Sequence, residues 1–278
     1  MALNNVFNLI KFKEVTIVGS YADPHILYPS DIDLHEHVTV NDYEAILNRF
    51  IEILRDVHKS MTVYFTDLKC GSMYNGKAIR WTLNDLKRGY QYIEDRKVHF
   101  IDTLQYKSVI KLDLIALLKG YFVEITINYF FQNGSRTTRI EEDQLNSFKS
   151  SFNKHYKAGE YYKALKRLYK YYAANKDTKK VKRIASIFNS DLGRLNKSII
   201  DLELIQTLLN IRGPKPSLHD IKHNLNLIAT ASKEMTDDIK QIPTYSFKSI
   251  DGGIQRVLKR WKPWIEAQFA DHIKKFMN

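Results

Sequence analysis

Hydrophobic and polar positions repeat with two different periods along the chain, and the period changes near residue 145. In the first part, short runs rich in β-branched and aromatic residues predict strands at 14–19, 30–38 and 62–70 and a long hairpin over 106–131. One helix is expected there, at 41–59, where Asn41 can cap the first turn. From about Glu141 onward apolar residues recur at helical spacing, over 160–174, 179–210 and 218–235. The pattern predicts an α/β unit followed by an all-helical unit.

Two short segments in the helical part predict interruptions. Residues 212–217, with the sequence RGPKPS, contain glycine and prolines and predict a break between two helices. Gly252 and Gly253 predict a second break, because adjacent glycines weaken the interior of a helix. The sequence is therefore divided into a domain at 1–145 and a helical domain at 146–278.

Two aspartates, Asp31 and Asp33, flank Ile32 inside the second predicted strand. Residues two apart in a strand point to the same face, about 6.6 Å apart along the chain. Carboxylates held side by side repel each other, so the pair is typical either of an exposed edge strand that carries acids or of a site that binds divalent cations. Taken alone, the pair favours the edge strand.

The predicted hairpin supplies a further acid. Polar and apolar residues alternate on both strands, and the two apolar faces align only if a two-residue turn at Lys119–Gly120 joins them. In that register Asp113 pairs with Thr126, and Glu124 lies one diagonal step away. We expect the polar face to line a cleft, and its members are Lys111, Asp113, Glu124, Thr126 and Asn128. A solvated sheet face in which Lys111 pairs with Asp113 explains the same pattern.

Gly19 and Ser20 follow the first predicted strand and precede the two aspartates. Glycine lets the backbone approach a ligand closely, and turn amides together with a serine hydroxyl can hold a phosphate. A hydrophobic strand, Gly-Ser, a spacer and Asp-hydrophobic-Asp-hydrophobic resembles the signature of the DNA polymerase β-type nucleotidyltransferase superfamily. Here the signature consists of Val18-Gly19-Ser20, the spacer 21–30 and Asp31-Ile32-Asp33-Leu34.

A later part of the chain extends the resemblance. Lys111-Leu112-Asp113-Leu114 matches the basic-hydrophobic-Asp-hydrophobic pattern in which the family often carries its third acid. The segments KLDLIALLKGYFVEI and FNSDLGRLN are also similar to nucleotidyltransferases of large DNA viruses, akin to the catalytic subunit of poxvirus-type poly(A) polymerases. The fold implied is α+β, with a nucleotidyltransferase palm of mixed β-sheet and flanking helices followed by an all-helical domain.

The resemblance also implies roles for the acids. Asp31 and Asp33 would hold two Mg²⁺ or Mn²⁺ ions, and Asp113 would bind the catalytic ion and help to deprotonate the 3′-hydroxyl of a primer. Glu124 is the rival third acid, because some family members carry that acid after the hairpin turn.

The nucleotide would be held by other residues. The amide of Gly19 and the hydroxyl of Ser20 would grip the β- and γ-phosphates. Lys111 is a further candidate nucleotide-binding residue, and a surface lysine with no such role is the alternative.

The net charge of the chain indicates which kind of molecule it binds. The 278 residues include 43 Lys and Arg against 31 Asp and Glu, a net charge of +12 that attracts polyanions. The lysine- and tyrosine-rich segment 153–183 is a candidate track for single-stranded nucleic acid, with Tyr161, Tyr169 and Tyr171 as stacking residues. The same segment also has the spacing of an amphipathic helix, with a core face made of Tyr162, Leu165, Leu168 and Tyr172.

Three features bear on the compartment. No apolar run approaches the length of a membrane span, and the N-terminus lacks the features of a signal peptide. The single cysteine, Cys70, excludes an internal disulfide and is typical of a reducing compartment. We expect a cytoplasmic protein with no membrane partner.

The order of the domains selects a function within the resemblance. A palm followed by helices is the layout of poly(A), terminal-uridylyl and CCA-adding enzymes. We expect a Mg²⁺-dependent, template-independent RNA 3′-nucleotidyltransferase, similar to poly(A) polymerase, that transfers NMP from an NTP, ATP above all, to the 3′ end of single-stranded RNA by a two-metal mechanism. The alternatives are gap-filling DNA synthesis of the polymerase X type, a non-catalytic RNA-binding or scaffold subunit, and transfer of a nucleotide onto a protein.

Overall fold

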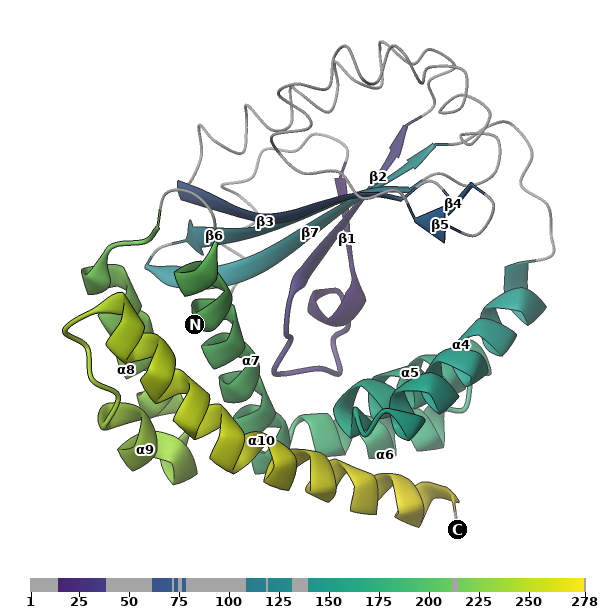
Figure 1. Cartoon of the computed structure of the whole chain (residues 1–278). Helices are drawn as coiled ribbons and strands as arrows, with labels where there is room; N and C mark the ends of the chain where they lie inside the picture. Colours follow the sequence, from purple (N-terminus) through teal and green to yellow (C-terminus); the bar gives the residue numbers. More distant parts are fainter. Residues whose placement is uncertain are drawn as a thin grey trace. The chain divides into compact units, whose positions relative to one another are not determined.

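A computed structural model describes residues 15–38, 62–71, 73–74, 77–78, 109–118, 120–131, 140–211 and 215–277. The expected helix at 41–59 lies outside these residues. Within them the strands come first along the chain and the helices follow, so the fold is α+β as predicted (Figure 1). None of the helices in the described ranges is long and apolar enough to cross a membrane.

The chain forms two compact units, and each is assembled from separate stretches of sequence. The first unit contains Met1–Asp23, Ser30–Ser135 and Thr207–Asp220. The second contains Pro24–Pro29, Arg136–Gln206 and Ile221–Asn278. The short stretch Pro24–Pro29 thus belongs to the second unit, although it lies between two segments of the first.

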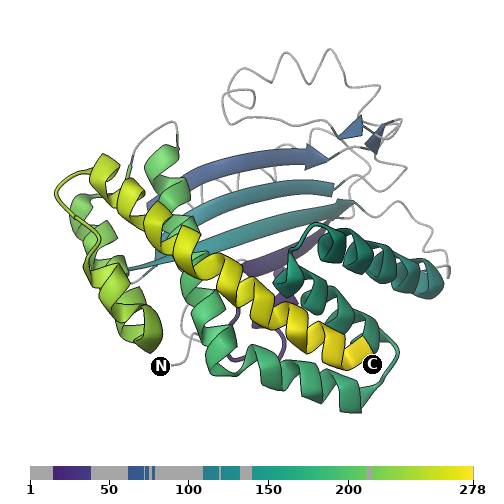
Figure 2. The ribbon, with the colours of Figure 1, turned by 60° about the horizontal axis from the view of Figure 1, so that its bottom comes forward.

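A five-stranded sheet forms the centre of the first unit, with the strand order β1-β2-β7-β6-β3. The sheet is mixed, because β2 and β7 are parallel whereas the other neighbours are antiparallel. Figure 2 shows β3, β6 and β7 running side by side. A separate pair, β4 and β5, forms a small antiparallel sheet. The elements are β1 (Val15–Val18), the 3₁₀ turn η2 (Gly19–Tyr21), β2 (Ile32–Val38), β3 (Thr62–Gly71), β4 (Met73–Tyr74), β5 (Lys77–Ala78), β6 (Val109–Leu118) and β7 (Tyr121–Phe131).

The hairpin of β6 and β7 has the register that the sequence predicts. Leu118 pairs with Tyr121, so the strands are joined by the two-residue turn at Lys119–Gly120. Gly120 has a φ of 84°, which glycine adopts without the steric penalty of a side chain. Further along the hairpin, Asp113 pairs with Thr126 as expected.

The polar face of this hairpin is partly covered. Thr126 is only 3% exposed, and Ile115, which pairs with Glu124, is 1% exposed. Glu124 itself is half-buried. The expected cleft floor therefore contains buried positions as well as accessible ones.

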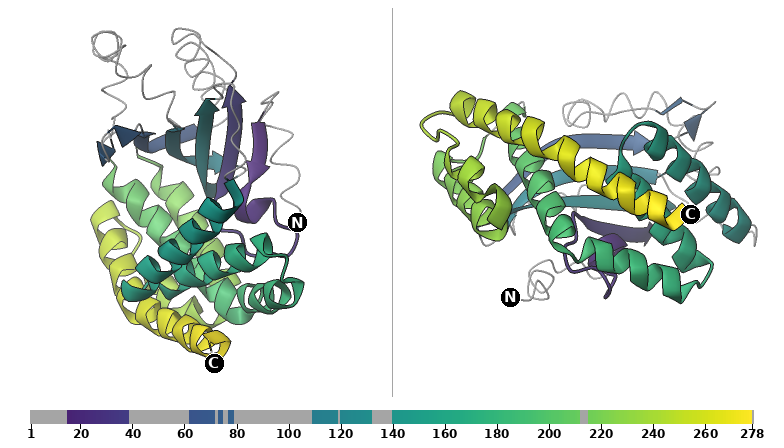
Figure 3. Two further views of the ribbon diagram at one scale, coloured as in Figure 1. Left: turned by 90° about the vertical axis from the view of Figure 1, so that its right-hand side faces the viewer. Right: turned by 90° about the horizontal axis from the view of Figure 1, so that it is seen from below.

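The second unit is built from helices. Its long C-terminal helix contacts α5 and α9 and extends along the unit, as both views of Figure 3 show. Helix α7 is shared, because its last residues belong to the first unit. The helices are α4 (Ile140–Lys157), α5 (Tyr161–Ala174), α6 (Thr178–Phe188), α7 (Asp191–Asn210), α8 (Leu218–Ala231), η3 (Lys233–Met235), α9 (Thr236–Lys240) and α10 (Phe247–Met277).

Two expectations about the helices need correction or refinement. The break predicted at Gly252–Gly253 is wrong, because α10 runs through both glycines. A β-carbon at Gly253 would approach Cγ2 of Ile242 to 2.7 Å, so this glycine permits close packing and does not end the helix. The periodic segment 179–210 is divided between α6 and α7 at Asn189–Ser190. Helix α7 ends at Asn210 and α8 begins at Leu218, on the two sides of the predicted break, of which 212–214 lie outside the described residues.

Candidate nucleotide site

The Gly-Ser turn begins directly where β1 ends, at Val18, and Val18 pairs with Asp33 on β2. Gly19 has a φ of 76°, in the left-handed region that favours glycine. A β-carbon built on Gly19 would overlap with Oδ2 of Asp33 and lie 3.2 Å from its Cγ. The turn therefore needs glycine for two reasons, and its backbone lies against the Asp33 carboxylate.

Ser20 contributes a polar atom that has no partner among the residues that the structure describes. Its Oγ is buried and forms no hydrogen bond with any other described atom. A buried hydroxyl left without a partner costs about 1–3 kcal/mol, so such atoms mark places where a ligand or a water completes the hydrogen bonding. The hydroxyl is one residue away from the Gly19 backbone that lies against Asp33.

The two aspartates flank a buried residue. Ile32 is completely buried, whereas Asp31 and Asp33 are both half-buried. Asp31 immediately precedes β2, and the hydroxyl of Ser30 donates a hydrogen bond to its Oδ1. Ile32 anchors the start of the strand in the core and leaves the neighbouring acids partly accessible.

The register of the sheet relates the candidate third acids to this pair. Asp33 pairs with Thr126 on β7, and Thr126 pairs in turn with Asp113 on β6. Adjacent strands are about 4.8 Å apart, so the backbone of Asp113 lies about 10 Å from that of Asp33. Ile32 pairs with Ile125, so Glu124 lies on the strand next to β2, one residue before the partner of Ile32.

Among the described side chains, no group of three or more His, Cys, Asp or Glu residues is arranged to hold a metal ion. Asp31, Asp33 and Glu124 belong to the described side chains. The side chain of Asp113 does not, and its place is given by the register of β6 alone.

Sequence reasoning missed two positions on β3. A register shift between Phe65 and Asp67 brings Asp67 opposite Asp113 and Lys69 opposite Lys111. Since the side-chain period of a strand is two, these residues would lie on the other face without the extra residue of this bulge. The segment TDLK carries the same acid-apolar-lysine alternation as KLD on β6, and this is the signal that could have drawn attention to it.

Paired positions share a face of a sheet, so the register produces two adjacent rows across four strands. One row is acidic apart from a threonine, and the next contains basic and amide residues. The first row is Asp33, Thr126, Asp113 and Asp67, and the second is His35, Asn128, Lys111 and Lys69.

The candidate nucleic-acid track in the helical unit is only partly exposed. Tyr169 is 8% exposed and packs edge-on against Phe188 at a centroid distance of 6.0 Å, so its proposed stacking role is wrong. Tyr161 and Tyr171 are half-buried. Leu165 is completely buried, as its amphipathic spacing predicts.

Comparisons with known proteins show which solved structures have a similar fold. No protein-family model matches the sequence, and no curated protein matches it. Among solved structures, the Mg662 protein of M. chilensis in complex with GTP superposes with a TM-score of 0.63 at 16% identity, over 98% of this chain and 89% of that one. A structure described as a new nucleotidyl transferase encoded by a Megaviridae ORFan gene gives a TM-score of 0.66 at 14% identity, over 99% of this chain and 92% of that one.

A further structure with the same description gives a TM-score of 0.63 at 15% identity, over 98% of this chain and 88% of that one. The superposition covers nearly the whole chain in each case, so the chain has the same fold as these three structures.

Proposed function

We propose that the chain is a nucleotidyltransferase that binds a nucleoside triphosphate at the Gly19–Ser20 turn, beside Asp31 and Asp33. The observation that carries the proposal is the contact of the Gly19 backbone with Asp33, one residue from the unpartnered buried hydroxyl of Ser20. A phosphate oxygen would satisfy that hydroxyl, and the turn has no β-carbon in the way. Two structures of similar fold that are described as nucleotidyl transferases support the same class of activity. The Mg662 protein, which also has a similar fold, is bound to GTP.

A divalent cation fits the chemistry of the acids. Carboxylate oxygens are the ligands that Mg²⁺ prefers, commonly one or two together with phosphates of the substrate. We propose Asp31 and Asp33 as protein ligands and Asp113 as the third acid, with Mg²⁺ or Mn²⁺ as the ion. Bound there, the ion would neutralise negative charge that develops on the phosphates during transfer.

Other steps of the proposed reaction are assigned to further residues of the chain. Ser20 donates its hydroxyl hydrogen to a phosphate oxygen, while the backbone of Gly19 keeps the turn against Asp33. Asp113 is proposed to accept the proton of the attacking hydroxyl. Lys111, in the row next to Asp113, is proposed to offset the charge of the phosphates.

The acceptor is proposed to be the 3′-hydroxyl of single-stranded RNA, with adenylate as the transferred group. The net charge of +12 supports a polyanionic acceptor, and the resemblance of KLDLIALLKGYFVEI to poly(A) polymerase subunits supports RNA. The GTP complex of the Mg662 protein makes GTP a necessary competitor of ATP in any test.

The test is a transfer assay with each labelled ribo- and deoxyribonucleotide, Mg²⁺ or Mn²⁺, and a single-stranded RNA oligonucleotide. Lengthening of the RNA by the wild-type chain, and none by Asp33→Asn, is the expected result. Asp271→Asn serves as a matched control, because Asp271 is an exposed acid whose salt bridge joins Lys274 across one turn of the same helix. Incorporation only on gapped DNA duplexes would support the DNA polymerase alternative, and absence of transfer to RNA, DNA and protein would contradict the proposal.

A further inference from the structure

The loop between the Gly-Ser turn and Asp31 is held by one side chain from the helical unit. Asn189 uses both ends of its amide group on the backbone of this loop. Its Oδ1 accepts a hydrogen bond from the Leu27 amide at 2.8 Å, and its Nδ2 donates one to the His25 carbonyl at 2.7 Å. The segment Pro24–Pro29 belongs to the same unit as Asn189.

The side chain of Leu27 contributes little to holding this loop. Leu27 is 66% exposed and His25 is exposed as well, whereas Ile26 is half-buried. Apolar burial stabilises in proportion to the area removed from water, so Leu27 gives the loop little apolar anchorage. The paired hydrogen bonds to Asn189 are specific contacts that hold the backbone at His25 and Leu27.

Asn189 itself lies at a rigid corner. It caps the C-terminus of α6, where its backbone N–H donates a hydrogen bond to the Ala185 carbonyl at 2.9 Å. The hydroxyl of the next residue, Ser190, donates a hydrogen bond to the Ile187 carbonyl at 2.7 Å. A β-carbon at Gly193 would overlap with the carbonyl oxygen of Phe188, so α7 begins in close contact with the end of α6.

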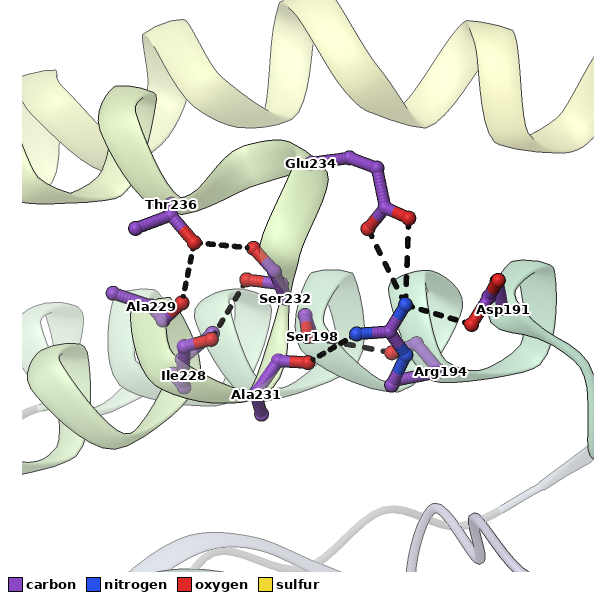
Figure 4. A network of polar contacts seen from close by, with 9 residues as sticks. All are labelled: Asp191, Arg194, Ser198, Ile228, Ala229, Ala231, Ser232, Glu234 and Thr236. Carbon is purple, nitrogen blue, oxygen red and sulfur yellow. Dashed lines mark hydrogen bonds and ion pairs between the residues drawn. The ribbon is translucent and has the colours of Figure 1, made fainter.

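The start of α7 is tied to the neighbouring helices through Arg194, as Figure 4 shows. Its guanidinium binds Asp191 at 2.7 Å, Glu234 at 3.3 Å and the carbonyl of Ala231 at 2.8 Å. These contacts link α7 with the end of α8 and with η3. The corner that carries Asn189 is therefore held from both sides, by α6 and by this network.

The two ends of the loop adjoin the two parts of the candidate nucleotide site, which are the Gly19–Ser20 turn and the acids Asp31 and Asp33. Tyr21 ends the turn that contains Gly19 and Ser20, and Ser30, at the other end, donates a hydrogen bond to Asp31. A change in the backbone at 25–27 is transmitted along a few residues to both halves.

We propose that Asn189 is a positioning residue for the nucleotide site, which it sets by fixing the backbone of residues 25–27. The inference rests on the proposed function, because it assigns a role in nucleotide binding to a residue of the helical unit. It gives a physical reason for Asn189 in the segment FNSDLG: the side-chain amide has both the donor and the acceptor that the two loop contacts require.

The test compares Asn189→Ala with Asn175→Ala. Asn175 is the matched control, because it caps the C-terminus of α5 and its Nδ2 donates to the Tyr171 carbonyl at 2.8 Å, without touching the loop. Three quantities are measured for each protein: hydrogen exchange of the Leu27 amide, the Kd for ATP and GTP with Mg²⁺, and the melting temperature.

In Asn189→Ala we expect the Leu27 amide hydrogen to exchange faster with solvent. We also expect the variant to bind the nucleotide about tenfold more weakly, because two neutral hydrogen bonds are lost. Asn175→Ala should lower the melting temperature similarly and leave both other readouts unchanged. Asn189→Asp keeps the acceptor for Leu27 but places a carboxylate oxygen against the His25 carbonyl, which it repels. This variant should therefore protect the Leu27 amide better than Asn189→Ala does, without restoring the wild-type affinity.

Three outcomes would overturn the inference. Equal nucleotide affinity of Asn189→Ala and the wild type would exclude a positioning role while leaving the proposed function intact, and so would an equal loss of affinity in both alanine variants. A wild-type chain that binds no nucleotide would overturn both proposals together.

Discussion

The α-carbon of Gly19 faces the carboxylate of Asp33 so closely that a β-carbon there would overlap with Oδ2. The left-handed backbone of Gly19, with a φ of 76°, and the pairing of Val18 with Asp33 produce this contact. The turn and the acid are therefore structurally coupled, and a change in one must move the other.

Gly19→Ala should inactivate the protein. The added β-carbon must displace Asp33 or the turn, and a misplacement of about 1 Å in a reacting group can cost about 100-fold in rate. Transfer activity and nucleotide affinity check this. Gly159→Ala is the matched control, since Gly159 has a φ of 73° but no atom within 4 Å of an added β-carbon. It should cost about 1–2 kcal/mol of stability and no activity; equal activity of the two variants would contradict the coupling.

Ser20→Ala should separate stability from binding. Removing a buried hydroxyl that has no partner in the described part of the chain relieves a desolvation cost of about 1–3 kcal/mol, so the melting temperature without ligand should stay the same or rise. Nucleotide affinity should fall about tenfold or more, because a hydrogen bond to a charged phosphate is lost. Calorimetric titration with Mg²⁺-ATP checks the second part. Unchanged affinity would mean that the hydroxyl does not meet the nucleotide.

The third acid can be identified by substitution. If Asp113 completes the site, Asp113→Asn should lower transfer by about 1000-fold or more, comparable to Asp33→Asn, and Glu124→Gln should have a much smaller effect. The sheet makes the comparison informative, because Glu124 lies on the strand beside β2 whereas Asp113 lies one strand further away. The reverse order of effects would assign the role to Glu124, and Asp67→Asn extends the comparison to the acid opposite Asp113.

An ion-pair cluster at the start of α5 gives a prediction of pH dependence. Hydrogen bonds from Lys163 and then His155 lower the pKa of Glu160 from 4.5 to about 2. Because the folded-state pKa is depressed, the contribution to stability is complete above the unfolded pKa and is lost as pH falls towards about 2. The difference in melting temperature between wild type and Glu160→Gln should therefore shrink between about pH 6 and about pH 3. The side chain is 39% exposed, so solvent screening keeps this effect small. A difference that grows towards low pH would contradict the assignment.

The sequence was sufficient for the hairpin register but not for the order of the strands. Alternation over β6 and β7 and the turn at Gly120 determine that Asp113 faces Thr126. Alternation contains no information on which hairpin strand lies beside β2, and the structure inserts β7, with Thr126, between Asp33 and Asp113. The bulge that turns Asp67 to the same face likewise leaves no periodic signal in β3.

In the helical part of the chain, tertiary packing in places determines where helices begin and end, against the local preference of the residues. Gly252 and Gly253 favour a break by propensity, but Gly253 is buried against Ile242 and tertiary contact overrides the preference. In 179–210 the apolar spacing continues across Asn189, because the helices on both sides bury apolar faces. The amide contacts of Asn189 at this corner join it to His25 and Leu27, which are distant in sequence, so the spacing within 179–210 does not indicate them.

The proposed nucleotide and metal site is tested most directly by diffraction from crystals grown with Mn²⁺ and a non-hydrolysable nucleoside triphosphate. We expect anomalous density for Mn²⁺ against the carboxylates of Asp31 and Asp33, with a phosphate oxygen within hydrogen-bond distance of the Ser20 hydroxyl. Mn²⁺ and nucleotide bound elsewhere on the chain, with Ser20 still unpartnered, would contradict this expectation.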